Sequence, residues 1–219
     1  MVEAKRDALE AATEEVVAFA RRMIVDGLST GTSGNISVRV EDRIAITPAS
    51  MSYEEMEPED VCVVDSEGRA VSGGSPSSEL QMHLTAYRDD RVGAVVHTHP
   101  MYTTALSTVI DELPAIHYVI ARLGGPVRVA PYATPGSLEL ARRFEAGLEG
   151  RTGVILANHG AVTVGGSLQE AYARSVTLEW LAQLYFTASV LGRRPAIVSA
   201  EQVNELMQRL ERRKGGGAA

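Results

Sequence analysis

The chain has 219 residues, 45% of them hydrophobic and 22% charged, a profile typical of one globular domain that can bury a core without cross-links. Its 21 basic and 28 acidic residues give a net charge of −7, which argues against nucleic acid or an anionic membrane as a general partner. The single cysteine, Cys62, excludes an internal disulfide and a cysteine-built zinc knuckle. The charged N-terminus and the lack of an apolar run of about 18 residues predict a cytoplasmic protein.

Helices and β-type segments alternate along the chain. Apolar residues at helical spacing predict helices over residues 3–26, 79–88, 137–148 and 168–191, with another beginning near residue 102. Short β-type segments are expected at residues 36–40, 43–47, 61–64, 92–97, 127–130, 154–157 and 161–164, whereas residues 116–123 are ambiguous. Either Ser77 or Ser78 is a suitable N-cap for the helix that follows it, and Ser199 and Gln202 fit a capping box for the last helix.

No internal repeat or linker divides this alternation. The sequence therefore predicts one α/β or α+β domain over residues 1–214, with helices covering a mixed or largely antiparallel sheet. The tail at residues 215–219 contains only glycine and alanine, and we expect it to be disordered.

The strongest candidates for chemistry are histidines. His97 and His99 lie at the end of the most apolar strand, and residues two apart in a strand point to the same face. Two neutral imidazoles side by side form half of a tetrahedral zinc site. Taken alone, the pair is equally consistent with surface or capping histidines.

His159, between two predicted strands and before a glycine, could supply the third imidazole of a metal site that keeps one position open. Glu79 begins a helix after a glycine- and serine-rich loop. It is either a solvated first-turn carboxylate or, beside a metal, a fourth ligand or general base. His83 follows one helical turn later and is best interpreted as a packing or hydrogen-bonding histidine.

Three loops are rich in hydroxyls and backbone N–H groups that could cradle an anion. They comprise residues 32–35, 47–50 and 75–78. Other His-x-His families fit poorly. A cupin needs a glutamate soon after the pair, a barrel amidohydrolase needs a longer chain, and a metallo-β-lactamase extends the motif to His-x-His-x-Asp-His.

Several motifs, in order from about residue 9 to residue 200, resemble the zinc-dependent class II aldolase/adducin-like family and, within it, the branch that acts on L-fuculose 1-phosphate. The motifs that carry this resemblance are Gly31-Thr32-Ser33-Gly34-Asn35, Ser77-Ser78-Glu79, His97-Thr98-His99, Ile116-His117-Tyr118 and Asn158-His159-Gly160. The family implies a three-layer α/β/α domain with a mostly antiparallel central sheet. It also implies a homotetramer with its sites at subunit interfaces and one Zn²⁺ per subunit.

The resemblance also implies roles for individual residues. The implied metal ligands are Glu79, His97, His99 and His159, with Glu79 also acting as acid/base. The implied phosphate-binding turns contain Gly34, Asn35, Ala49, Ser50, Ser77 and Ser78. Tyr118 is implied to protonate the aldehyde oxygen in a neighbouring subunit's site. The expected substrate is a small phosphorylated sugar, cleaved to dihydroxyacetone phosphate and an aldehyde such as L-lactaldehyde.

The chain departs from the family pattern at three places. Ala49 and Ser50 stand where Thr-Gly is usual, Pro135 replaces an aromatic residue of the aldehyde pocket, and no tyrosine follows residue 204. Dehydratase, decarboxylase and epimerase reactions on the same scaffold remain alternatives, although the epimerase typically has aspartate at the position of Glu79. A non-catalytic module like the adducin head would be expected to lose metal ligands that this chain keeps.

Overall fold

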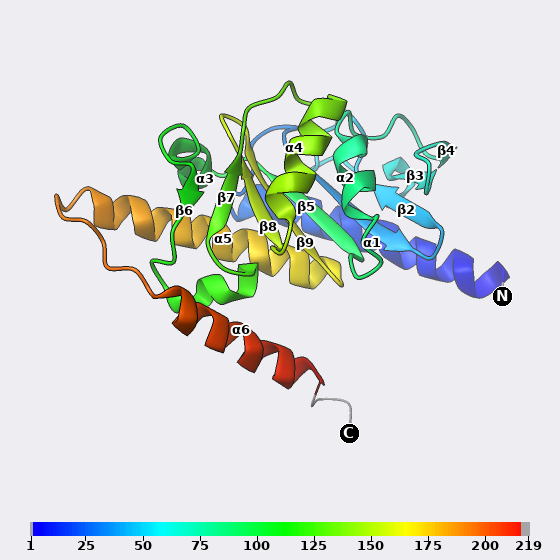
Figure 1. The fold of residues 1–219 in the computed structure, drawn as a ribbon. Helices are drawn as coiled ribbons and strands as arrows, with labels where there is room; N and C mark the ends of the chain where they lie inside the picture. The colour runs from blue at the N-terminus through cyan, green and yellow to red at the C-terminus, as the bar shows by residue number, and fades with distance from the viewer. Residues whose placement is uncertain (1, 216–219) are drawn as a thin grey trace.

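The computed structural model describes residues 2–215, which form a nine-stranded sheet covered by helices (Figure 1). The strand order is β4-β3-β2-β1-β5-β9-β8-β7-β6. The strands are β1 Asn35–Val40, β2 Arg43–Ile46, β3 Cys62–Asp65, β4 Ala70–Ser72, β5 Ala94–Thr98, β6 Glu112–Leu113, β7 Val127–Ala130, β8 Gly153–Leu156 and β9 Gly160–Gly165. Within the described chain every neighbouring pair is antiparallel except β7 and β8, which are parallel.

Helices cover both faces of this sheet, in three layers (Figure 1). The α-helices are α1 Val2–Val25, α2 Leu80–Ala86, α3 Met101–Leu106, α4 Leu138–Leu148, α5 Leu168–Ser189 and α6 Ala200–Gly215, and the 3₁₀ helices are η1 Pro58–Asp60 and η2 Tyr118–Leu123. Helices α2 and α4 pack on one face, whereas α1 and α5 pack on the other. Helices α3, α6 and η2 extend the layer formed by α5.

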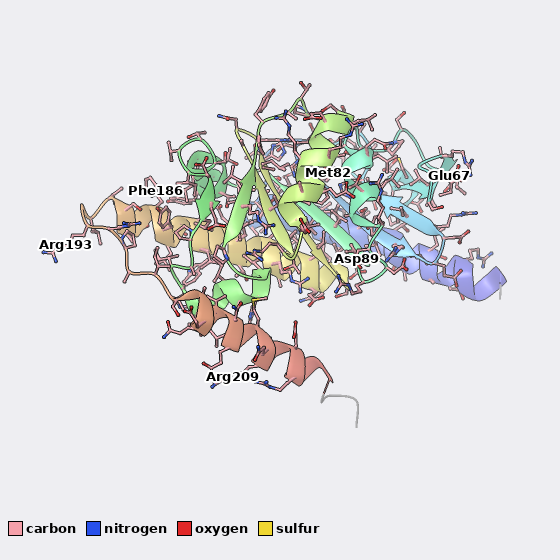
Figure 2. The ribbon with its side chains drawn as sticks, viewed as in Figure 1. Glu67, Met82, Asp89, Phe186, Arg193 and Arg209 are labelled. Atoms are coloured by element: carbon pink, nitrogen blue, oxygen red, sulfur yellow. The ribbon has the colours of Figure 1, made fainter. Side chains whose placement is uncertain are left out.

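The alternation of strand side chains explains how one sheet supports two cores. In β9, Val162 packs with α2 and α4, whereas Ala161 packs with α5 on the opposite face. Figure 2 shows Arg193 and Arg209 projecting away from the sheet, beyond α5 and from α6, whereas Met82 of α2 is buried. No helix among the described residues is long and apolar enough to cross a membrane.

The predicted α/β domain with a largely antiparallel sheet is confirmed, as are the principal helices and strands. The capping box is also present, because Ser199 N–H donates to Gln202 Oε1 and Gln202 N–H donates to Ser199 Oγ. The ambiguous segment at residues 116–123 contains η2. Of the tail expected to be disordered, Gly215 ends α6 and residues 216–219 lie outside the described residues.

Three local expectations are corrected. Strands β4 and β6 were not predicted, because β4 consists of three exposed residues and β6 of only two residues. The N-cap of α2 is Glu79 rather than Ser77 or Ser78. Ser77 Oγ instead accepts a hydrogen bond from the Glu79 N–H at 3.3 Å, so this hydroxyl fixes the residue that begins the helix.

Candidate metal centre

The four side chains predicted as metal ligands converge on one point. Each of Glu79, His97, His99 and His159 offers a ligand atom, and these atoms all lie within 4.8 Å of one another. The central strands bring the histidines together, because β5 carries His97 and ends just before His99, while His159 immediately precedes the neighbouring strand β9. Glu79 reaches the same point from the N-terminus of α2.

Short distances link the members of this cluster. Glu79 Oε2 lies 3.0 Å from His97 Nε2, and Glu79 Oε1 lies 3.4 Å from His159 Nε2. The Nε2 atoms of His97 and His99 are 2.9 Å apart. The carboxylate is 6% exposed and His97 is fully buried, so neither group can rely on bulk water for solvation.

The hydrogen bonding of His97 presents a lone pair to the cluster. Its Nδ1 lies 2.9 Å from the carbonyl oxygen of Ala161, which can only accept, so Nδ1 carries the proton in the neutral ring. Nε2 is then the lone-pair nitrogen, the arrangement that a backbone carbonyl imposes on metal-binding histidines. Within residues 2–215, the buried Oε1 of Glu79 has no hydrogen-bond partner. Three imidazoles and a carboxylate in this arrangement fit a divalent cation such as zinc.

Electrostatics favour the protonation states that metal binding requires. Burial, together with the charge on His97, lowers the pKa of His99 to about 3 and that of His159 to about 4, so both rings are neutral at neutral pH. Burial alone would raise the pKa of Glu79. When no metal is bound and His97 also carries a proton on Nε2, its charge, its hydrogen bond and the hydrogen bond from Asn35 outweigh burial and hold this pKa well below its usual range, so the carboxyl is ionised. A metal ion in the place of that proton would act in the same direction.

The three turns predicted to bind phosphate are brought together beside Glu79. An isolated bridge pairs Pro48 with Pro76, which joins the second turn to the third. The first turn is joined to the second by the Thr47 N–H, which donates to the Ile36 carbonyl at 3.0 Å. In these turns Ala49, Ser50 and Ser78 are exposed, whereas Gly34, Asn35 and Ser77 are buried.

Gly34 occupies a position that no other residue could take unchanged. Its φ of 75° lies in the left-handed region, and a Cβ there would come within 2.6 Å of Ser29 Oγ and 2.7 Å of the His97 carbonyl. The Tyr53 hydroxyl also donates to the Gly34 carbonyl. This turn is therefore held directly against the strand that carries the metal-ligand candidates.

Tyr118, which was predicted to belong to the site, lies at the surface of the chain, away from the cluster. It begins η2, is 60% exposed, and packs its ring against His117 with the centroids 4.4 Å apart. The ring of His117 in turn lies edge-on to Trp180 of α5, at 5.0 Å. The four cluster residues thus meet within one chain, whereas Tyr118 faces outward.

The residues that support the carboxylate of Glu79 were not predicted from the sequence. Asn35 Nδ2 donates to Glu79 Oε2 at 3.0 Å, although the resemblance assigned Asn35 only to a phosphate turn. His83 is a hydrogen-bonding histidine, as predicted, and its partners are Asn35 and Ser37. The alternation of polar Asn35, Ser37 and Arg39 with apolar residues in β1 is the signal that could have identified this face of the strand.

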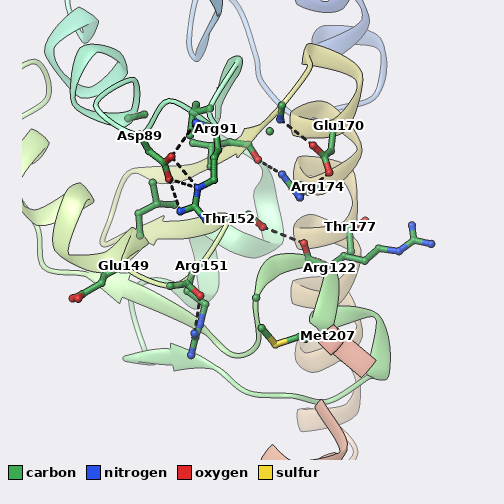
Figure 3. A pocket seen from close by; sticks show the side chains of 18 of the residues that line it. Asp89, Arg91, Arg122, Glu149, Arg151, Thr152, Glu170, Arg174, Thr177 and Met207 are labelled. Atoms are coloured by element: carbon green, nitrogen blue, oxygen red, sulfur yellow. Dashed lines mark hydrogen bonds and ion pairs between the residues drawn. The ribbon is translucent and has the colours of Figure 1, made fainter. Parts of the chain in front are cut away.

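A wide pocket lies at the far end of the same strands (Figure 3). Val92 before β5 and Gly166 after β9 line it, whereas the metal-ligand candidates lie at the opposite ends of β5 and β9. Arg91 is ion-paired with Asp89 within this pocket. Arg174 is likewise paired with Glu170 at 2.9 Å, so these guanidinium groups already have acidic partners.

Known proteins resemble this chain over most of its length. The family model "Class II Aldolase and Adducin N-terminal domain" matches residues 14–186. A 5-deoxy-D-ribulose 1-phosphate aldolase from Bacillus thuringiensis is 37% identical over 207 residues, covering 93% of this chain and 97% of the relative. An L-fuculose phosphate aldolase from Escherichia coli K12 is 35% identical over 187 residues, covering 84% of this chain and 87% of the relative.

Solved structures agree with the sequence relatives. An L-fuculose 1-phosphate aldolase superposes with a TM-score of 0.88 at 35% identity, covering 92% of this chain and 96% of that chain. A fold alone would not define chemistry. Here the family match covers the strands and turns that assemble the Glu79 and histidine cluster. The chain therefore belongs to the class II aldolase and adducin family, as an aldolase-type lyase.

Proposed function

We propose that this protein is a zinc-dependent aldolase that cleaves a ketose 1-phosphate between C3 and C4 into dihydroxyacetone phosphate and a short aldehyde. The observation that supports this most directly is the buried cluster of Glu79, His97, His99 and His159 beside three polar turns. The cluster supplies sites for a metal and a proton, and the turns supply neutral donors for a phosphate.

The proposed substrates are L-fuculose 1-phosphate and 5-deoxyribulose 1-phosphate, the sugar phosphates that appear in the names of relatives 35% and 37% identical to this chain. Cleavage of either would give the same dihydroxyacetone phosphate. The aldehydes would be L-lactaldehyde and acetaldehyde, which both end in a methyl group. Pro135 stands in the segment assigned to the aldehyde pocket, where the family usually has an aromatic residue. This difference would affect which of the two aldehydes the pocket accepts.

Each site residue then has a defined task. A divalent cation held by the three histidines would act as a Lewis acid and stabilise the enediolate left by C–C cleavage. The turns that contain Gly34, Ala49–Ser50 and Ser77–Ser78 would hold the phosphate, so that binding energy remote from the reacting bond orients the substrate.

Two proton transfers complete the cleavage. In the condensation direction, the ionised Glu79 takes a proton from C3 of dihydroxyacetone phosphate, and the Tyr118 hydroxyl of a neighbouring subunit gives its proton to the aldehyde oxygen as the C3–C4 bond forms. Cleavage reverses both transfers. The C4 hydroxyl returns its proton to the Tyr118 oxygen, the electron pair of the C3–C4 bond remains on the C3 side, and the proton held by Glu79 goes back to C3.

A homotetramer with sites between subunits is part of this proposal. The exposure of Tyr118 (60%) and Trp180 (44%) on one side of the chain supports it, because aromatic side chains are enriched in subunit interfaces. With one zinc ion per chain, each site would combine the metal cluster of one subunit with Tyr118 of the next.

Cleavage of both sugar phosphates, followed through release of dihydroxyacetone phosphate, tests the proposal. The protein would be assayed as purified, after chelation, and after zinc is restored. We expect cleavage that disappears with the metal and returns with zinc. If a folded, zinc-loaded protein released no dihydroxyacetone phosphate from either substrate, the proposal would be wrong, and the dehydratase and decarboxylase reactions would be assayed next.

A further inference from the structure

A buried chain of hydrogen bonds runs behind Glu79. Tyr87 OH lies 2.7 Å from Ser37 Oγ, and Ser37 Oγ lies 2.6 Å from His83 Nδ1. His83 Nε2 is 2.5 Å from Asn35 Oδ1, and Asn35 Nδ2 is 3.0 Å from Glu79 Oε2. All five residues are buried, and Ser37 and His83 are fully inaccessible.

This series of hydrogen bonds can form because polar side chains recur at nearly the same spacing along α2 and along β1. Glu79, His83 and Tyr87 succeed one another at intervals of four along α2 and its two caps, about 6 Å apart. Asn35 and Ser37 lie two apart in β1, on one face and about 6.6 Å apart. Each polar side chain of the strand therefore falls between two polar side chains of the helix.

The direction of every bond in the chain follows from its acidic end. An ionised carboxylate can only accept, so the Asn35 amide must turn its NH₂ towards Glu79 and its oxygen towards His83. His83 must then donate from Nε2, which leaves Nδ1 to accept the Ser37 proton. Ser37 Oγ in turn accepts from the Tyr87 hydroxyl, so every donor points towards Glu79.

His83 suits this role because it stays neutral. Burial, and then the charge on His97, lowers the pKa of His83 to about 3, so the ring keeps one donor and one acceptor nitrogen. This series of hydrogen bonds also gives the two carboxylate oxygens of Glu79 different surroundings. Oε2 accepts from Asn35 and lies against His97, whereas Oε1 lies 3.4 Å from His159 Nε2 and has no hydrogen-bond partner among the described residues.

We propose that His83 is a positioning residue for Glu79. Its neutral Nε2–H tautomer, which the Asn35 amide requires and the Ser37 hydroxyl completes at Nδ1, holds the Asn35 amide so that Oε2 is anchored and Oε1 is the oxygen that takes and gives the proton. This inference rests on the proposed function, because it assigns proton transfer to Glu79. The tautomer itself does not depend on turnover.

The first test measures that tautomer in the wild-type protein. Long-range nitrogen–proton correlation spectra of protein labelled at histidine would be recorded, with the His83 signals assigned by their loss in His83→Gln. We expect a protonated Nε2 and a bare Nδ1 throughout the neutral range. A ring protonated at Nδ1, or at both nitrogens, would overturn the inference whether or not the protein is an aldolase.

The second test compares two substitutions of similar size at residue 83. His83→Gln can still donate to Asn35 and accept from Ser37, whereas His83→Leu can do neither. We expect kcat of the folded His83→Leu protein to fall by about 10- to 100-fold, the effect of losing a hydrogen bond that orients a charged group, and His83→Gln to recover most of it. Equal kcat values for the two variants, measured well below their unfolding temperatures, would contradict the inference.

Ser175 offers a matched control for the loss of a buried hydroxyl. Its Oγ lies 2.6 Å from Thr163 Oγ1 on the α5 side of the sheet, apart from the chain behind Glu79. Ser37→Ala and Ser175→Ala should both lower stability, but only Ser37→Ala should also lower kcat. Equal kcat values for the two serine variants would leave Ser37 with a purely structural role and contradict the proposal.

Discussion

The Nε2 atoms of His97 and His99 lie 2.9 Å apart, and His97 already uses its Nδ1 proton on the Ala161 carbonyl. Two neutral rings cannot both present lone pairs at this distance without repulsion. A metal ion held between them would relieve this repulsion. The pair is therefore a buried site arranged to bind a cation.

Metal removal should leave a folded but less stable protein. Because an ion that binds only the native state stabilises it by mass action, zinc at a thousandfold excess over Kd should add about 4 kcal/mol to the free energy of unfolding. Thermal unfolding with and without a chelator measures this shift, and elemental analysis should find one metal per chain. His99→Ala should abolish both the thermal shift and the bound metal. His117→Ala, which changes a histidine outside the cluster, should bind metal as wild type does.

Glu79→Gln should separate binding from turnover. The neutral amide keeps the size of the side chain and can still accept from Asn35, so we expect normal folding and retained metal. Without an ionisable group, kcat should fall by about 10²- to 10⁴-fold. Glu179→Gln is a useful contrast, because this carboxylate accepts from the Tyr102 and Thr103 N–H groups at the start of α3. Glu179→Gln should lower stability but leave kcat nearly unchanged. If kcat fell as far as in Glu79→Gln, the assignment of proton transfer to Glu79 would be weakened.

Gly34→Ala and Gly31→Ala form a matched pair. Both glycines have positive φ, 75° and 61°, so alanine costs about 1–2 kcal/mol of backbone strain at either position. Only at Gly34 would the new methyl group meet Ser29 and the His97 carbonyl, whereas at Gly31 nothing lies within 4 Å. Chemical denaturation should therefore show a loss at Gly34 several kcal/mol larger. Equal losses of stability in the two variants would show that the turn at Gly34 can shift to accommodate the methyl group.

Mixing two inactive variants tests whether sites are shared between subunits. Tyr118→Phe and Glu79→Gln should each be nearly inactive as homo-oligomers. In hybrids assembled from equal amounts after unfolding and refolding, about a quarter of the sites should combine an intact Glu79 with an intact Tyr118 from the neighbour. Activity near that fraction is expected. Hybrids no more active than the parents would place Tyr118 outside a neighbour's site.

Acid should destabilise the metal-free protein in the pH range where His83 is protonated in the unfolded chain but not in the folded one. Burial lowers the pKa of His83 from 6.5 to about 3, so between these values the unfolded chain binds a proton that the folded chain does not. This contribution to stability is complete above pH 6.5 and decreases by about 1.4 kcal/mol per pH unit as pH falls towards 3. Denaturation curves from pH 7 to 4 should be less steeply pH-dependent for His83→Gln than for wild type. An unchanged dependence would show that His83 becomes protonated while the protein is folded.

Local patterns were enough to predict some features of the strands and helices. The spacing of His97 and His99 placed both on one face of a strand, and the capping residues Ser199 and Gln202 marked the start of α6. Such features depend on periodicity and on hydrogen bonds within a few residues, which a sequence displays directly.

Contacts between distant segments could not be predicted in this way. Asn35 meets Glu79 only because β1 and β5 pair with Asn35 opposite His97, a register set by the whole sheet. The order of Ser37 and His83 behind Asn35 depends on how α2 lies across β1. Strand β4 was missed for a different reason, since its three residues are all exposed and lack apolar alternation.

The position of the metal-ligand candidates in the sheet also bears on how the protein matures. His97 and His99 are preset by one strand, but His159 joins them only when β9 pairs with β5, and Glu79 joins only when α2 docks. Two hydrophobic clusters on opposite faces hold these elements together without an ion. Binding of a metal by all four residues would therefore follow the packing of these elements. Loss of that metal would leave the chain folded, unlike a zinc finger, which unfolds without its ion.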